Sequence, residues 1–126
     1  MEKIKKYLGK RGRWTYPIKS LINSGSVVSF GSDAPIEDPN PMRGIKVSVE
    51  RKVDGVDFYP EEAITLKEAF KAYTINGAIS VGEERRLGSI KEGKVADFIV
   101  LDDDPFLLNA KVISTYINGI NVFQTP

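Results

Sequence analysis

The stretch VVSFGSDAP, residues 27–35, decides how the rest of the chain is interpreted. Val27, Val28 and Phe30 form a short, nearly continuous apolar run, which is typical of a strand covered on both faces in a parallel sheet. We therefore predict a strand over residues 26–30, ended by the glycine that follows. Because ligands and chemistry gather at the carboxyl ends of strands in α/β folds, the polar residues after the run are candidate site residues.

Asp33 is the candidate whose side chain offers the most chemistry at this strand end. A carboxylate in such a place can be a metal ligand, a general base, or both. It can equally cap a turn, because an Asp before Ala-Pro bonds nearby backbone N–H groups. The residues of this stretch leave these alternatives open.

The length and composition indicate a folded domain. The chain has 126 residues, of which 41% are hydrophobic, so it is long enough for a core and is neither disordered nor membrane-spanning. No apolar run approaches the ~20 residues that a bilayer requires. The first ten residues, MEKIKKYLGK, lack the apolar core of a signal peptide. We therefore expect a cytoplasmic protein without a membrane partner.

The chain contains neither cysteine nor histidine, which restricts the chemistry open to it. Disulfides, thiolate metal sites and cysteine nucleophiles are excluded. A metal held by these residues alone would need carboxylates and carbonyls, which favours Mg or Ca over Zn. The three aspartates at 102–104 are too compact for a calcium loop, and we interpret them as a solvated turn.

The net charge is +1, but residues 1–19 carry seven Lys or Arg against one acid. Trp14 and Tyr16 lie within the same segment. Basic residues with interleaved aromatic residues can bind nucleic acid. A charge run more often simply faces water, so we interpret the segment as a basic surface helix and do not expect a nucleic-acid partner.

Apolar residues at helical spacing predict four helices. The first three cover residues 3–8, 17–24 and 41–53, although the last of these also fits an alternating strand. The fourth begins at Thr65, where Thr65 and Glu68 form a capping box. It either fades near residues 76–77 or continues to stop at Gly82.

After Gly82 the pattern of the sequence is typical of β-strands and turns. We predict strands over residues 96–101, 112–117 and 120–123. The strand over residues 96–101 is expected to be buried. Asn-Gly between the last two is the strongest short hairpin signal. The chain thus divides into residues 1–82, with helices and one parallel-type strand, and residues 83–126, a small antiparallel unit. A parallel-type strand without parallel neighbours is an incomplete sheet.

The order of these motifs resembles the C-terminal portion of metal-dependent amidohydrolases. The similarity is greatest to the branch labelled amidohydrolase 3 or exoenzyme regulatory protein. It is carried by WTYPIKSLINSG at 14–25, GSDAP at 31–35, YTINGA at 73–78, GSIKEGKVADFIVLDDDP at 88–105 and INGINVF at 117–123. Each motif is common alone, whereas their order and spacing together are specific.

The resemblance implies a fold and a role for Asp33. Such enzymes are (β/α)8 barrels with the site at the carboxyl ends of the strands and a small β-sandwich built from segments near both termini. Their metal, typically zinc, is held mostly by His. An Asp after the eighth strand binds the metal and takes a proton from the attacking water, and Asp33 matches it. The implied fold class is α/β: residues 1–82 form the last αβ unit or units of the barrel, and residues 83–126 an antiparallel β unit of the sandwich.

The chain departs from the family pattern because nothing in it matches the first seven strands. A barrel takes about 250 residues. We therefore expect the C-terminal piece of a larger enzyme that uses zinc or another divalent metal. The complete enzyme would hydrolyse a non-peptide C–N bond of a small amide-like substrate with metal-activated water. The chain alone is expected to bind no metal and to be inactive.

The alternative function is a non-catalytic interaction module. An open strand edge and unburied helix faces favour self-association, or a partner chain that supplies the missing barrel. On this interpretation the chain is expected to form oligomers.

Overall fold

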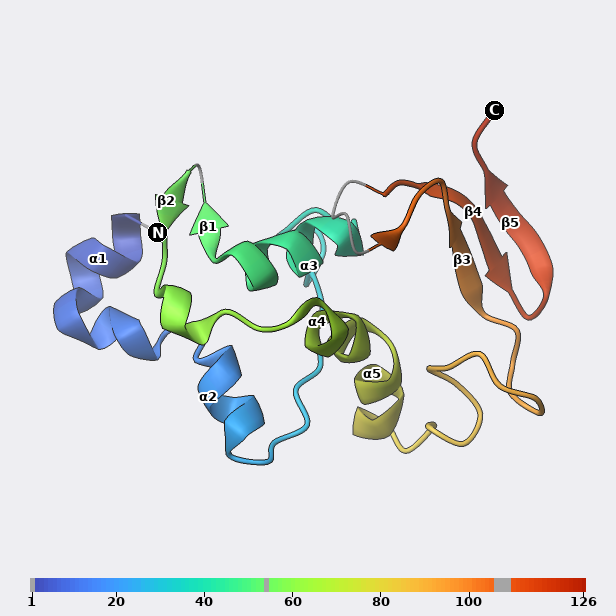
Figure 1. Cartoon of the computed structure of the whole chain (residues 1–126), viewed down its shortest axis with the longest axis horizontal. Helices are drawn as coiled ribbons and strands as arrows, with labels where there is room; N and C mark the ends of the chain where they lie inside the picture. Colours follow the sequence, from blue (N-terminus) through green and yellow to red (C-terminus); the bar gives the residue numbers. More distant parts are fainter. Residues whose placement is uncertain (1, 54, 106–109) are drawn as a thin grey trace.

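The computed structural model describes residues 2–53, 55–105 and 110–126. Helices make up most of the first part of the chain, and a three-stranded sheet lies at the other end of the molecule (Figure 1). The helical elements are α1 (Glu2–Leu8), the 3-10 helix η1 (Gly9–Trp14), α2 (Ile18–Asn23), α3 (Pro41–Glu50), the 3-10 helix η2 (Pro60–Glu62), α4 (Leu66–Tyr73) and α5 (Ile75–Ser80). The strands are β1 (Lys52–Val53), β2 (Val56–Asp57), β3 (Phe98–Leu101), β4 (Val112–Ile117) and β5 (Ile120–Gln124).

The predicted helices are confirmed, with one interruption. The segment that also fitted a strand is the helix α3, which ends at Arg51 in a left-handed conformation with φ 49°. Thr65 and Glu68 form the capping box at the start of α4. The helix then breaks at Thr74 (φ −125°, ψ −99°), and α5 continues to Ser80. None of the described helices has the length and apolar character needed to cross a bilayer.

The hydrophobic core lies where α3 meets α4. Its buried members are Met42, Ile45, Ile64 and Ala69, and Ile45 is only 1% exposed. Half-buried aromatic side chains, including Tyr73, extend this cluster. The contact is close because residue 44 of α3 is a glycine, and a Cβ there would collide with the hydroxyl of Tyr73. The apolar stripes of the two helices therefore form the centre of the fold.

The strand predicted over residues 26–30 is wrong, since these residues belong to no sheet. A strand requires neighbours for its backbone groups. Within the described residues, the two sheets β1-β2 and β3-β4-β5 are antiparallel and neither includes this stretch. Its apolar run is only partly covered: Val27 is 58% exposed. The structure thus has helices and a small antiparallel sheet but does not confirm a barrel strand.

The C-terminal sheet has the strand order β3-β4-β5, with both pairs antiparallel. The predicted hairpin is confirmed: Asn118 and Gly119 have φ values of 51° and 76°, as a two-residue loop of type I′ requires. Asp97 accepts a hydrogen bond from the backbone N–H of Asn118 at 2.7 Å, which ties the start of β3 to this turn. The expectation that β3 is buried is wrong, because Ile99 is 41% exposed.

Candidate functional site

Asp33 lies in a turn that its own backbone closes. The residue has a left-handed conformation with φ 51°, and its carbonyl oxygen accepts a hydrogen bond from the N–H of Ile36 at 2.9 Å. The Asp33 side chain is exposed, and its carboxylate has no hydrogen bond or ion pair with the part of the chain that the structure describes. The turn is therefore built without the side-chain cap considered above, and the carboxylate is free to bind something else.

The stretch before Asp33, residues 26–30, is hydrogen-bonded to the end of α4 and the start of α5. The N–H of Phe30 donates to the carbonyl oxygen of Ala72 at 3.0 Å, and Asn76 Nδ2 donates to the carbonyl oxygen of Val28 at 2.8 Å. The rings of Phe30 and Tyr73 meet edge to face with centroids 5.4 Å apart. These contacts hold Val28 and Phe30, the residues just before the turn, against α4 and α5.

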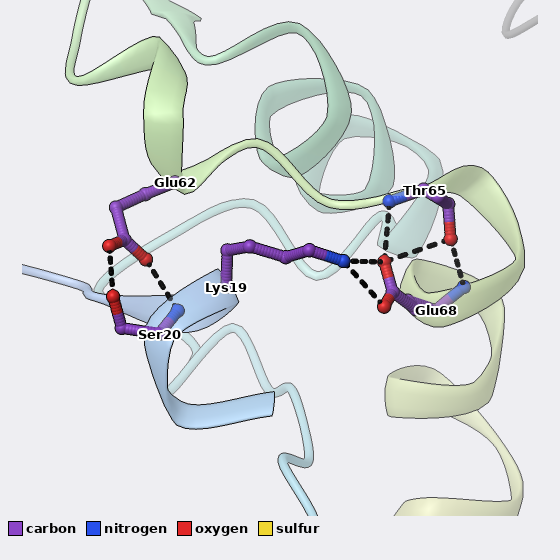
Figure 2. Close-up of polar contacts among 5 residues, drawn as sticks. All are labelled: Lys19, Ser20, Glu62, Thr65 and Glu68. Atoms are coloured by element: carbon purple, nitrogen blue, oxygen red, sulfur yellow. Dashed lines mark hydrogen bonds and ion pairs between the residues drawn. The ribbon is translucent and has the colours of Figure 1, made fainter. Parts of the chain in front are cut away.

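Two carboxylates anchor the helix α2, which leads into the same stretch (Figure 2). Glu62 accepts hydrogen bonds from Ser20, one from the backbone N–H at 2.9 Å and one from the hydroxyl. Because Pro17 provides no side-chain cap, Glu62 satisfies an N–H of the first turn of α2 in its place. Lys19 Nζ lies 2.8 Å from Glu68 Oε1, which joins α2 to α4.

The pKa values of both anchoring carboxyls are lowered. The hydrogen bond from Lys19 is the main cause for Glu68, assisted by the backbone N–H of Thr65, and it lowers the pKa to about 2. Burial raises the pKa of Glu62, but the hydrogen bonds from Ser20 and the backbone of Lys19, together with the charge of Arg51, lower it by more, so the net shift of this pKa is downward. Both groups are therefore ionised near neutral pH and hold α2 in place.

Replacing Lys19 by methionine should make the free energy of unfolding depend less on pH under acidic conditions. The pKa of Glu68 falls from 4.5 to about 2 on folding, so its contribution to stability is fully present above about pH 4.5 and is lost as the pH falls through about 2. The stability advantage of the wild type over Lys19→Met should therefore shrink across that range. Urea unfolding at a series of pH values measures it, with the exposed Lys67→Met as the control. Parallel curves for wild type and Lys19→Met would contradict this assignment.

Arg51 is a buried charged residue that the sequence did not single out. It is 5% exposed, and its Nε donates to the carbonyl oxygen of Phe58 at 3.1 Å. Burial lowers the pKa of Arg51, while the nearby Glu62 and Glu61 act in the opposite direction. The guanidinium also lies over the ring of Phe58. Arg51 thus has a packing role between the end of α3 and the segment that joins β2 to η2.

The described residues do not assemble a metal centre. Within residues 2–53, 55–105 and 110–126, no group of three or more His, Cys, Asp or Glu side chains is placed to hold an ion. Asp33 offers one carboxylate, whereas a catalytic zinc site takes about three protein ligands. An open groove of about 590 Å³ lies beside α5, lined by Ile75, Ile79 and Gly88 among others, and Asp33 is not part of its lining. The residues present therefore do not by themselves fit the metal that the resemblance implies.

The chain matches part of several longer proteins. A family model described as "Amidohydrolase family" matches residues 4–123. The protein YtcJ of Bacillus subtilis (strain 168), provisionally named an amidohydrolase, is 37% identical over 128 residues, which cover 93% of this chain and 24% of YtcJ. The N-substituted formamide deformylase of Arthrobacter pascens is 36% identical over 112 residues, or 83% of this chain and 21% of the deformylase.

A solved structure of an uncharacterized protein shares the fold. It superposes with a TM-score of 0.63 at 24% identity, covering 95% of this chain and 28% of that one. The chain thus spans between a fifth and a quarter of the length of the two curated relatives. The arrangement of its elements recurs within a longer polypeptide.

Proposed function

Because the chain belongs to the amidohydrolase family, we propose that it is the C-terminal segment of a hydrolase that cleaves non-peptide C–N bonds. Two units make up the segment in this proposal. Residues 1–82 contribute to the catalytic barrel, and residues 83–126 contribute to a composite β domain. The match of the family model to residues 4–123, which spans both units, is the observation that carries the proposal.

Asp33 is the proposed catalytic and metal-binding residue. A non-glycine residue in the left-handed region costs on the order of 1 kcal/mol, and such residues cluster at functional sites. Asp33 has φ 51° and an exposed carboxylate, on a turn that follows a stretch hydrogen-bonded to α4 and α5. That arrangement suits a group that accepts a proton from water or joins a zinc or other divalent ion. The other metal ligands are assigned to polypeptide outside these residues, and no catalytic step is derived from this chain alone.

The proposed substrate is a small amide-like molecule. The name of the Arthrobacter pascens relative specifies an N-substituted formamide, whose bond between nitrogen and the formyl carbon is a non-peptide amide bond. We choose this class as the first substrate to test.

The isolated chain should not hydrolyse an N-substituted formamide, even with added zinc or manganese, because it supplies too few metal ligands. Asp33→Ala should change the free energy of unfolding by less than about 1 kcal/mol, since the side chain has no described partner. Product release and urea unfolding of both proteins are the measurements. Robust metal-dependent turnover that disappears in Asp33→Ala would overturn the segment proposal.

The second candidate function is a non-catalytic module that self-associates or binds a partner chain. Large apolar side chains at several places on the surface favour it: Val27 is 58% exposed, Val81 70% and Ile90 83%. Isolated exposed apolar residues are common, so only a contiguous group of them identifies an interface.

A further inference from the structure

Asn76 is a residue that the local structure of α5 does not explain. Asparagine and glycine are both poor helix formers, yet Asn76 and Gly77 stand side by side among the six residues of this helix. Proteins break such local rules mainly where a side chain has a functional task. The half-buried Asn76 side chain has a distant partner, because its Nδ2 donates to the carbonyl oxygen of Val28, 48 residues earlier, at 2.8 Å.

The junction between α4 and α5 holds residues 26–30 at two points. Beside the Asn76 bond, the N–H of Phe30 donates to the carbonyl oxygen of Ala72 at 3.0 Å. Ala72 lies in the last turn of α4, where carbonyl groups have no partner within the helix, so this acceptor is open to a distant donor. Val28 and Phe30 are half-buried, whereas the residues next to them are exposed. The contacts with the junction are therefore made by alternate residues.

Beyond Phe30 the chain has little support before α3 begins. Residues 31–40 are exposed, apart from the half-buried Ser32. A Cβ built on Gly31 would meet no described atom within 4 Å beyond its chain neighbours. Asp33 lies in this exposed loop, three residues after Phe30. Among the residues that the structure describes, the bonds at the junction are the last hydrogen bonds to the rest of the fold before Asp33.

The helix α5 is also held by the segment that follows it. The N–H of Glu83 donates to the carbonyl oxygen of Ala78 at 2.9 Å. Gly88 lies so close to α5 that a Cβ on it would be 2.8 Å from the Cα of Ile75. A helix of six residues is marginal on its own, so these contacts are needed to hold it. The amide of Asn76 thus projects from an element whose place is set by packing, as the support of a functional site requires.

We propose that Asn76 is a positioning residue for Asp33. By holding the carbonyl group of Val28, the amide of Asn76 sets the direction in which the chain leaves the junction, and with it the place of the Asp33 carboxylate five residues later. In this role Asn76 acts only through Asp33 and needs no contact with the substrate. The inference rests on the catalytic role proposed for Asp33.

The first test measures backbone hydrogen exchange in the full chain, with and without Asn76→Ala. Alanine removes the amide but is the best helix former, so the substitution does not weaken α5 itself. The N–H of Phe30 should exchange at least about tenfold faster in the variant, while that of Ala69, fully buried in the core, keeps its rate. Unchanged exchange at Phe30, or an equal acceleration at Ala69, would overturn the proposal whatever the role of Asp33.

The second test measures kcat in a chimera in which this chain replaces the aligned region of the N-substituted formamide deformylase of Arthrobacter pascens. Asn76→Asp keeps the shape of the side chain but removes the donor. It should lower kcat at least about tenfold, because small displacements of a reacting group are costly. The matched control is Asn40→Asp, which adds the same charge at the far end of the loop that carries Asp33 and keeps the bond from the N–H of Met42. It should leave kcat nearly unchanged.

A double-mutant cycle separates positioning from a purely structural role. In the Asp33→Asn background, Asn76→Asp should lower kcat by less than about twofold further, because the group that it positions is already gone. Independent losses that multiply in full would show that Asn76 does not act through Asp33, and would overturn the proposal. An unchanged kcat in Asn76→Asp beside a nearly inactive Asp33→Asn would also overturn it and would leave the proposed function intact. An Asp33→Asn chimera with full activity would instead contradict the proposed function, and the inference with it.

Discussion

Replacing Gly88 by alanine is expected to destabilise the chain by about 3 kcal/mol, the sum of backbone strain and overpacking. Gly88 has φ 80°, a region that side chains with a Cβ rarely adopt. A Cβ at this position would lie 2.8 Å from the Cα of Ile75 and 2.8 Å from the Cβ of Ala78. Both are rigid parts of α5, so the clash cannot be relieved by rotating a side chain. The segment that leads into the C-terminal sheet would have to move off the helix.

Gly93→Ala is the matched control for this prediction. Gly93 belongs to the same segment and has φ 81°, but no described atom beyond its chain neighbours lies within 4 Å of a Cβ built there. Its replacement should therefore cost only the backbone strain, about 1 kcal/mol. Urea unfolding of the two variants at one protein concentration measures the difference. Equal losses would show that Gly88 does not pack closely against α5.

The elements that could be predicted from the sequence are those built by local interactions. The capping box needs only Thr65 and Glu68, three residues apart, and it forms as predicted. The last hairpin needs only the turn at Asn118 and Gly119 and the apolar residues beside it. In each of these the pattern and the contact lie within one stretch of chain.

The strand over residues 26–30 could not be judged locally, because a strand exists only if neighbours accept its backbone groups. The apolar run comprises Val27, Val28 and Phe30. The hydrogen bonds that hold this stretch involve Ala72 and Asn76, more than forty residues later in the chain. The same limit applies to β3. Its apolar composition predicts burial, whereas exposure depends on what covers the sheet.

The role of Asp33 stays a prediction. Asp33 is a candidate because of its place in GSDAP and the resemblance to the family, and no spacing rule alone identifies it. The anchors of α2 were missed because Lys19 and Glu68 are 49 residues apart. Contacts between distant residues leave no local pattern, and side chains that position a site are found only when the fold is known.

Joining this chain to the rest of a relative tests the proposed function most directly. In the N-substituted formamide deformylase of Arthrobacter pascens, the region that aligns with this chain at 36% identity would be replaced by it. The deformylase part then supplies the remaining polypeptide that the proposal requires. The chimera is expected to hydrolyse an N-substituted formamide in the presence of a divalent metal.

The deciding measurement is kcat of this chimera with Asp33→Asn, compared with Asp38→Asn. Asp38 lies in the same loop, where its Oδ1 accepts the N–H of Asn40 at 2.8 Å, a bond that an asparagine oxygen can keep. If Asp33 is the catalytic and metal-binding carboxylate, Asp33→Asn should lower kcat at least about 100-fold and Asp38→Asn should leave it nearly unchanged. A folded Asp33→Asn chimera that retains full activity would contradict the role assigned to Asp33.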